Sequence, residues 1–248
     1  MYTPLFVLIL NSFNQAQISS WPIENFSFKW WSFAASYEPI KAALLNSVLV
    51  ATGAMVIASI LGTLVAFALK GFDFFGKGTV NLLVVLPIAL PGVVTGVAFS
   101  NTYNSFLSPI GFDIGYFGMI VAHATFCIVM VFNNVFARLK RMNPNLQEAS
   151  ADLGAGLWQT FRLVTFPQFR TSFMAGALLA FALSFDEVVV TIFTAPPGVD
   201  TLPLWILKEM ARPNQGSVVN VVATVVILLS LIPVYVSQRL TRAQEENR

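Results

Sequence analysis

The sequence predicts an all-α integral membrane protein with about six transmembrane helices, and three observations lead to this fold class. Of its 248 residues, 56% are hydrophobic and only 10% are charged, whereas soluble domains contain about 25% charged residues. The mean hydropathy is +0.72. Several apolar runs also reach the length of about 20 residues that a helix needs to cross a bilayer. A soluble domain of this length could not bury so much apolar surface.

Five apolar runs are long enough to form spans. They cover residues 42–69, 80–102, 116–137, 173–194 and 218–236. A sixth run, residues 3–13, is too short to span, and it lacks the charged start and small-residue cleavage site of a signal peptide. We interpret it as the outer half of a truncated first span. The sequence therefore predicts a single transmembrane domain over residues 1–248.

The predicted span 80–102 contains residues that loosen a helix. It includes Pro87, Pro91, Gly92 and Gly96 within the string LPIALPGVVTG. A proline in a membrane helix frees backbone groups that neighbouring helices or water in a cavity must satisfy. Two interpretations stay open, an ordinary kink and a bend that shapes a pathway.

Positive charge predicts the orientation, because cytoplasmic loops carry an excess of Lys and Arg. With six spans both termini lie on one side, and the loops and tails of that side hold ten basic residues against four on the other. We therefore place both termini in the cytoplasm. The ten are Lys70, Lys77, Arg138, Lys140, Arg141, Arg162, Arg170, Arg239, Arg242 and Arg248, and the four are Lys29, Lys41, Lys208 and Arg212.

Three features exclude other classes of protein. The net charge is only +2, with no basic block, so no nucleic-acid partner is expected. The single cysteine, Cys127, lies in an apolar run and cannot form an internal disulfide. His123 is the only histidine and cannot build a metal site alone, so we expect a buried, hydrogen-bonded side chain.

A polar segment with strong helix signals lies between the spans 116–137 and 173–194. Asn143 can cap a helix whose first position is Pro144, and Asn145 with Glu148 offers an alternative start. The pattern predicts that Gly154 and Gly156 end this first helix.

A second helix is predicted over residues 157–166, with Pro167 ending it. Its residues Leu157, Phe161 and Val164 repeat at helical spacing and would form one apolar face. Small residues around position 150 would let another surface come close. The segment has the shape of a docking element, with a solvated loop as the alternative.

This segment resembles the EAA loop in permeases of bacterial ATP-binding-cassette importers. That loop reads Glu-Ala-Ala, three residues, Gly, nine residues, then Ile-x-Leu-Pro. The spacing matches throughout, with Ser for Ala, Val for Ile and Phe for Leu. In this sequence the matching residues are Glu148, Ala149, Ser150, Gly154, Val164, Phe166 and Pro167.

The whole chain resembles the spermidine/putrescine permeases of this class, and specifically the second of their two permease subunits. The strings that carry the likeness are LPIALPGVVTG (86–96), AHATFC (122–127), FNNVFARLKR (132–141), LSFDEVVVTIFT (183–194) and TLPLWIL (201–207). The resemblance implies a type I importer (MetI-like) bundle in the bacterial cytoplasmic (inner) membrane, translocating a polyamine by alternating access.

The resemblance also implies the partners. They are a sister permease subunit, two ATP-binding subunits and an extracytoplasmic solute-binding protein, with membrane lipid around them. The permease would not be an enzyme and would hold no cofactor, because the ATPase binds ATP and Mg. Residues 143–167 would be the cytoplasmic coupling helices. The residues expected to couple to the ATPase are Glu148, Ala149, Ser150, Asp152, Gly154 and Pro167.

Two adjacent carboxylates, Asp186 and Glu187, lie in the predicted span 173–194. An acid at that depth is costly and usually faces a partner or a wet cavity. On a continuous helix, Glu187 shares a polar stripe with Ser184 and Thr191, whereas Asp186 has apolar neighbours. We expect Glu187, Ser184 and Thr191 on the substrate pathway and Asp186 near it, against another helix. A purely structural role for both acids is the alternative.

Three rival functions are weaker. A secondary transporter would have more spans or inverted repeats and no use for the EAA-like segment. An intramembrane protease using Asp186 would need a second aspartate in a facing span, but the other aspartates fall in loops. The sequence argues least against a third alternative, a permease of the same type for 4-aminobutyrate, another amine or ferric iron.

Overall fold

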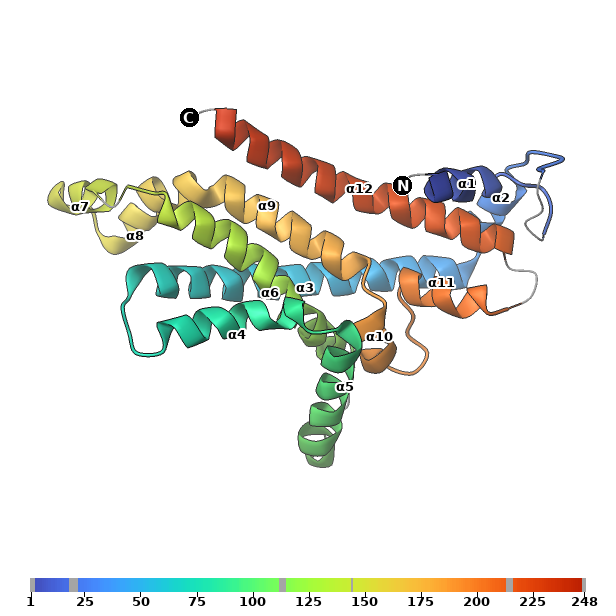
Figure 1. Cartoon of the computed structure of the whole chain (residues 1–248), viewed down its shortest axis with the longest axis horizontal. Helices are drawn as coiled ribbons and strands as arrows, with labels where there is room; N and C mark the ends of the chain where they lie inside the picture. The colour runs from blue at the N-terminus through green and yellow to red at the C-terminus, as the bar shows by residue number, and fades with distance from the viewer. Residues whose placement is uncertain (1–2, 18–21, 112–114, 144, 213–215, 247–248) are drawn as a thin grey trace. The chain divides into compact units, whose positions relative to one another are not determined.

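The structure is a computed structural model that describes residues 3–17, 22–111, 115–143, 145–212 and 216–246, with side chains as far as residue 240. Within these ranges the regular structure is helical, apart from one antiparallel bridge between Asn14 and Phe26. The helices (Figure 1) are α1 Thr3–Asn11, α2 Lys29–Ser36, α3 Glu38–Gly71, α4 Lys77–Ala89, α5 Gly92–Thr102, η1 Tyr103–Leu107, η2 Ser108–Ile110, α6 Tyr116–Lys140, α7 Asn145–Asp152, α8 Leu157–Thr160, η3 Phe161–Thr165, α9 Phe166–Phe185, α10 Val189–Thr194, α11 Leu202–Met210 and α12 Gly216–Glu246.

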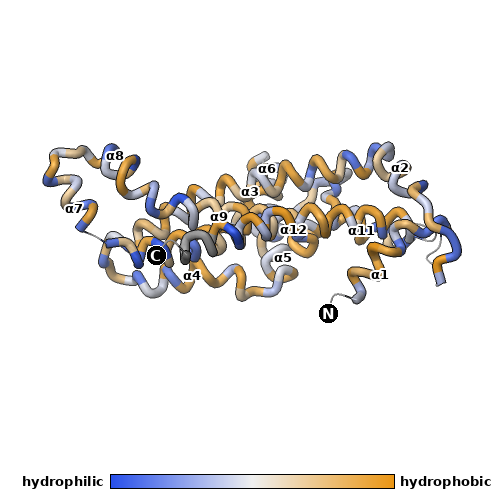
Figure 2. The backbone as a smooth tube through the Cα atoms, turned by 90° about the horizontal axis from the view of Figure 1, so that it is seen from above, coloured by the Kyte–Doolittle hydropathy of each residue, from blue (hydrophilic) through white to orange (hydrophobic). Residues whose placement is uncertain are grey.

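Three of the predicted spans are confirmed as long apolar helices. The runs 42–69, 116–137 and 218–236 lie within α3, α6 and α12, each of which is long and apolar enough to cross a membrane. Hydrophobic colouring follows most of α3 and α12 in Figure 2. The short run 3–13 contains α1, a helix of nine residues.

The predicted span over residues 80–102 is not one continuous helix, and its break is more than the ordinary kink that was one of the two interpretations left open. α4 ends at Ala89 and α5 begins at Gly92, so the two helices form either a broken span or a re-entrant loop. Leu90 between them is extended, with ψ of 141°. The residue before a proline is pushed out of the helical region, and Pro91 therefore fixes the break, while Pro87 is accommodated inside α4.

The prediction of a continuous helix over residues 173–194 is also wrong. α9 ends at Phe185 and α10 begins at Val189, which leaves residues 186–188 non-helical. The two acids therefore lie at a break in the helix. Helical spacing therefore does not place Asp186 and Glu187 on separate faces.

The chain forms two compact units that share long helices. The first comprises Met1–Ala51, Gly92–Ala122 and Phe185–Ile232, and the second comprises Thr52–Pro91, His123–Ser184 and Pro233–Arg248.

The second unit is built around α6, which α3 and α9 approach very closely. A Cβ atom on Gly62 of α3 would lie 2.9 Å from the backbone oxygen of Ile128. A Cβ atom on Gly176 of α9 would lie 3.0 Å from the Cα atom of Val131. Small residues let membrane helices pack backbone against backbone, and these two glycines set the spacing of the three helices.

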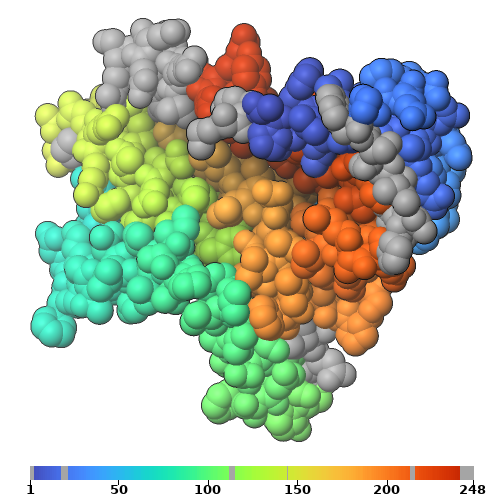
Figure 3. Space-filling model, turned by 45° about the vertical axis from the view of Figure 1, so that its right-hand side comes forward, coloured from blue at the N-terminus to red at the C-terminus, as the bar shows by residue number. Residues whose placement is uncertain are grey.

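In the first unit, α5 packs against α10 (Figure 3). A Cβ atom on Gly96 would lie 2.7 Å from the Phe193 ring, so the contact requires glycine. The segment LPLWILKEM forms α11, which buries Leu202 and Trp205. The Ser47 hydroxyl accepts a hydrogen bond from the Leu202 N–H at 2.8 Å and anchors the start of α11.

Candidate functional site

The EAA-like segment folds as a helical hairpin, which we define as α7, the turn 153–156, α8 and η3 (Figure 1). The Asn143 side chain caps α7, because its Oδ1 accepts a hydrogen bond from the Asn145 N–H at 3.0 Å. This confirms Asn143 as the cap. The predicted first helical residue, Pro144, lies outside the described residues.

Gly154 ends α7 as predicted. Its φ of +81° is a left-handed conformation that residues with a side chain rarely adopt. The N–H of Gly154 donates to the Ala151 oxygen at 2.9 Å, and the N–H of Ala155 donates to the Ser150 oxygen at 3.1 Å. These two bonds form a Schellman motif, which satisfies carbonyl groups at the helix end.

Gly156, the second residue predicted to end the first helix, has a different role. It is the N-cap of α8, with an ordinary φ of −70°. Its N–H donates to the Gln159 side-chain oxygen at 3.0 Å. Gly156 therefore begins the second helix of the hairpin and does not end the first.

Two side-chain hydrogen bonds hold the helices of the hairpin together. The hydroxyls of Ser150 and Thr160 lie 3.0 Å apart. The Gln147 amide donates to the Thr165 hydroxyl at 3.2 Å. Ser150 is thus turned toward the second helix. Of the other predicted coupling residues, Glu148, Ala149, Asp152, Gly154 and Pro167 are exposed.

Pro167 does not end the second helix, contrary to the prediction. α8 passes through a π-helical segment, η3, directly into α9, and Pro167 is the second residue of α9. A proline would remove one hydrogen bond of an α-helix and clash with the carbonyl four residues earlier. The wider π turn at residues 161–165 lies where that clash would occur and accommodates the ring. The predicted apolar face is only partly formed, because Phe161 packs against other aromatic rings whereas Leu157 is 94% exposed.

An aromatic cluster that sequence reasoning missed fastens the hairpin to the membrane helices. Phe161 lies 5.7 Å from Trp158 and 6.2 Å from Phe67 of α3, measured between ring centroids. Phe67 in turn lies 5.4 Å from Phe169, which is fully buried. The signal in the sequence is the density of aromatic residues between positions 158 and 173.

The tip of the hairpin presents large apolar side chains to the outside. Leu153 is 89% exposed and Trp158 is 69% exposed, close to the exposed Leu157. Adjacent exposed apolar residues of this size mark an interaction surface. Together with the carboxylates of Glu148 and Asp152, they give the hairpin an apolar tip and an acidic flank.

The second region with unusual chemistry is the break between α9 and α10. The Glu187 side chain accepts a hydrogen bond from the Val190 N–H at 2.9 Å. The Thr191 hydroxyl donates to the Glu187 carbonyl at 2.8 Å. These side chains satisfy backbone groups that the missing helical turn leaves free, as a break inside a bilayer would require.

The remaining acid and the neighbouring serine differ in environment. Asp186 is exposed and forms no hydrogen bond or ion pair in the described part of the chain. Ser184, the penultimate residue of α9, is buried, and its hydroxyl lies 2.9 Å from Nδ1 of the fully buried His123. His123 is therefore a buried, hydrogen-bonded histidine, as expected. The described residues contain no cluster of three or more potential metal ligands.

Comparison with known proteins identifies the family. A family described as "Binding-protein-dependent transport system inner membrane component" matches residues 1–245. The chain belongs to this family of transport-system membrane components. It is 31% identical to the spermidine/putrescine transport system permease protein PotC of Escherichia coli (strain K12) over 243 residues, which are 98% of this chain and 89% of that protein. It is 29% identical to the putrescine transport system permease protein PotI of the same organism, over 92% of this chain and 81% of that one.

The fold of this inner membrane component is shared with importers of known structure. A bacterial alginate ABC transporter, solved with an alginate-bound periplasmic protein, matches with a TM-score of 0.75 at 17% identity, covering 98% of this chain and 88% of that chain. The MetNI methionine ABC transporter matches with a TM-score of 0.59 at 17% identity, over 84% and 99% of the two chains. The predicted importer-permease fold is therefore confirmed.

Proposed function

We propose that this chain is a permease subunit of an ATP-driven importer that carries a spermidine- or putrescine-like polyamine across the bacterial cytoplasmic membrane. The observation that carries the proposal is the similarity to two polyamine permeases along nearly the whole chain. In a transporter of cations, carboxylates at a break in a membrane helix could bind the substrate.

The hairpin supports a docking role on a separate ATP-binding subunit. Its tip exposes Leu153, Leu157 and Trp158, which can enter an apolar cleft. Glu148 and Asp152 are exposed one helical turn apart and can pair with basic residues of the partner. The π turn and the aromatic cluster fasten this surface to α9, so a push on the hairpin acts on that helix. ATP and Mg would be held by the partner, and this chain would hydrolyse no ATP.

The break between α9 and α10 supports a role in the pathway. In it, Thr191 and one oxygen of Glu187 hold the backbone, and Ser184 holds the end of α9 to His123. Asp186 remains as an exposed carboxylate, and it can attract the ammonium groups of a polyamine. Alternation between inward- and outward-facing states would expose such a site to each side in turn. A sister permease would complete the pathway, and an extracytoplasmic binding protein would deliver the solute.

The excess of basic residues supports an orientation with the hairpin and both termini in the cytoplasm. This orientation places the docking surface on the side where ATP is available. Accessibility of single cysteines introduced at positions 153 and 208 to an impermeant thiol reagent tests it, since the two positions should label from opposite sides.

Transport assays test the function. The chain is reconstituted in vesicles with its partner subunits and binding protein, and uptake of putrescine, spermidine, 4-aminobutyrate and ferric iron is measured with and without ATP. ATP-dependent uptake of a di- or polyamine is the expected result. Uptake of a non-cation alone would overturn the substrate and keep the permease. Uptake driven by an ion gradient without ATP would overturn the importer.

A further inference from the structure

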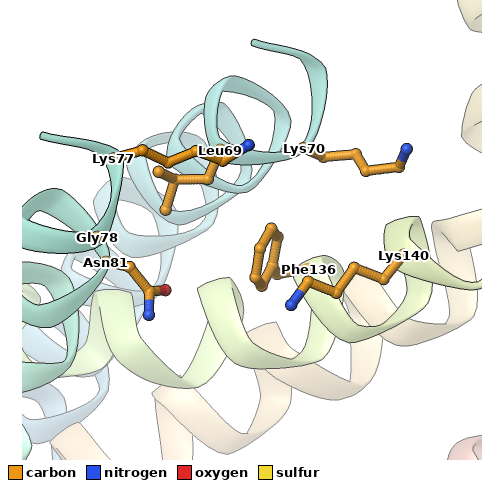
Figure 4. Close-up of a pocket in the computed structure, with 7 residues that line it drawn as sticks. All are labelled: Leu69, Lys70, Lys77, Gly78, Asn81, Phe136 and Lys140. Atoms are coloured by element: carbon orange, nitrogen blue, oxygen red, sulfur yellow. The ribbon is translucent and has the colours of Figure 1, made fainter. Parts of the chain in front are cut away.

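A pocket of ≈ 500 Å³ lies in the second unit where three helices meet (Figure 4). The end of α3 contributes Leu69 and Lys70, the start of α4 contributes Lys77, Gly78 and Asn81, and the end of α6 contributes Phe136 and Lys140. In the view of Figure 4, Lys70 and Lys77 lie on one side of the Phe136 ring and Lys140 on the other. Three lysines thus line a pocket with an apolar wall.

Two of the three lysines are not neutralised by any described residue of the chain. Lys77 pairs with Asp73, with Nζ and Oδ1 2.8 Å apart. This pair is needed locally, because a cation at the start of a helix such as α4 is unfavourable. The hydrogen bond from Lys77 lowers the pKa of Asp73, because it favours the charged form of that carboxyl. Lys70 and Lys140 form no ion pair with any described residue, so two positive charges remain at the pocket.

The wall of the pocket is fixed in place. The Phe136 ring stacks on Phe132, with ring centroids 5.0 Å apart, and Phe132 is fully buried. The Lys140 ammonium lies 4.4 Å from the centre of the Phe136 ring on which it packs. This lysine is therefore held beside the pocket by a cation–π contact.

The surroundings of the pocket are those of a membrane boundary. α3 and α6 are long and apolar enough to cross a membrane, and Lys70 and Lys140 lie in their last turns. The next turns of α4 expose Leu82, Leu83 and Leu86, and no described residue of α4 is buried. A ligand that fits here has an anionic end for the lysines and an apolar end for the leucines.

We propose that this pocket binds the phosphate-bearing head group of an anionic phospholipid, whose acyl chains lie along the exposed leucines of α4. Basic pockets between membrane helices bind such head groups. A zwitterionic lipid would place its own ammonium group among the lysines, where it is repelled. Free phosphate would satisfy the lysines but would leave the leucines uncovered, and so would a carboxylate of a partner protein.

The test uses the assembled transporter in a neutral detergent and measures lipid binding by native mass spectrometry. The probes are phosphatidylglycerol, phosphatidylcholine and inorganic phosphate. The Lys70→Gln/Lys140→Gln double variant is compared with Lys70→Arg/Lys140→Arg, which keeps the charge. A matched control, Lys41→Gln/Lys208→Gln, removes two lysines elsewhere on the chain. The melting temperature and subunit content of every variant are recorded.

We expect phosphatidylglycerol to bind more tightly than phosphatidylcholine to the wild type. One basic residue near an anionic lipid contributes about fivefold in affinity, so the glutamine double variant should lose roughly 25-fold. The arginine variant and the control should retain binding. Equal loss in the control, equal binding of the two lipids, or displacement of phosphatidylglycerol by inorganic phosphate would each overturn the lipid site. Loss of a partner subunit from the glutamine variant with lipid binding intact would assign the lysines to a protein contact.

Discussion

The chain interrupts its helices at residues 153–156 and again at residues 186–188, and it satisfies the freed backbone groups by different means. In the hairpin, main-chain bonds around Gly154 close the end of α7, and the nearby side chains stay exposed. At the second break, the side chains of Glu187 and Thr191 bond the backbone. The hairpin therefore depends on one backbone conformation, whereas the α9–α10 break depends on side-chain chemistry.

The two regions differ in whether the residues that hold the fold are also the residues available for function. In the hairpin, the residue that shapes the fold is a glycine, and the side chains on its surface are free for a partner. At the break, the same residue types that would suit a cationic substrate also hold the backbone. For any substitution at the break, protein stability must therefore be measured as well as transport.

The largest effect is expected for Gly154→Val. A β-branched residue at φ of +81° is strained by roughly 1–3 kcal/mol, and the turn should open. ATP-driven uptake should fall by more than about tenfold, since 1.4 kcal/mol corresponds to a factor of ten. The melting temperature of the membrane helices should change little. Gly156→Ala is the matched control, because Gly156 has an ordinary φ and a Cβ atom there would meet only the Gln159 side-chain oxygen, at an ordinary 4.0 Å. Normal uptake by Gly154→Val would contradict the coupling role.

Glu187→Ala is expected to destabilise the protein by about 1–3 kcal/mol, because the Val190 N–H loses its acceptor. Glu187→Gln keeps an acceptor oxygen and should melt close to the wild type. Thermal unfolding in detergent measures both. If the two variants lose equal stability, the hydrogen bond is not what Glu187 supplies. If Glu187→Gln leaves polyamine uptake and its KM unchanged, the charge has no part in transport.

Asp186→Asn should leave the melting temperature unchanged, because the side chain forms no hydrogen bond or ion pair with the described residues. The KM for spermidine should rise by about tenfold, since a bond to a charged group contributes about 1.5–3 kcal/mol. Uptake kinetics in vesicles measure it. An unchanged KM would remove Asp186 from the pathway, and a lowered melting temperature would give it a structural role.

The smallest effect is expected for Ser150→Ala, which removes the hydroxyl contact between α7 and α8. Such a bond contributes about 1 kcal/mol, so amide exchange in residues 145–152 should speed up by roughly fivefold. Exchange in α9 should not change. Ala149→Ser, at the exposed neighbouring position, is the control. Equal exchange in both variants would show that the two helices do not depend on this bond.

The sequence predicted what depends on local composition. Three long spans followed from uninterrupted apolar runs, and the hairpin followed from Asn143 and Gly154, whose roles are set by neighbouring backbone. The break at Asp186 was missed, because hydropathy counts apolar residues and ignores where backbone hydrogen bonds end. The continuation through Pro167 was missed because a π turn depends on tertiary packing, here on the aromatic cluster around Phe161 and Phe169.

The close packing of Gly62 and Gly176 on α6 has a consequence for genetics. The atoms that a new methyl group at either glycine would strike first belong to the α6 backbone, at Ile128 and Val131. A substitution on α6 changes a side chain and leaves these backbone atoms in place. A screen for second-site suppressors of Gly62→Ala should therefore return changes in α3 or α9 that move a whole helix, and none among the side chains of α6 that face the glycine.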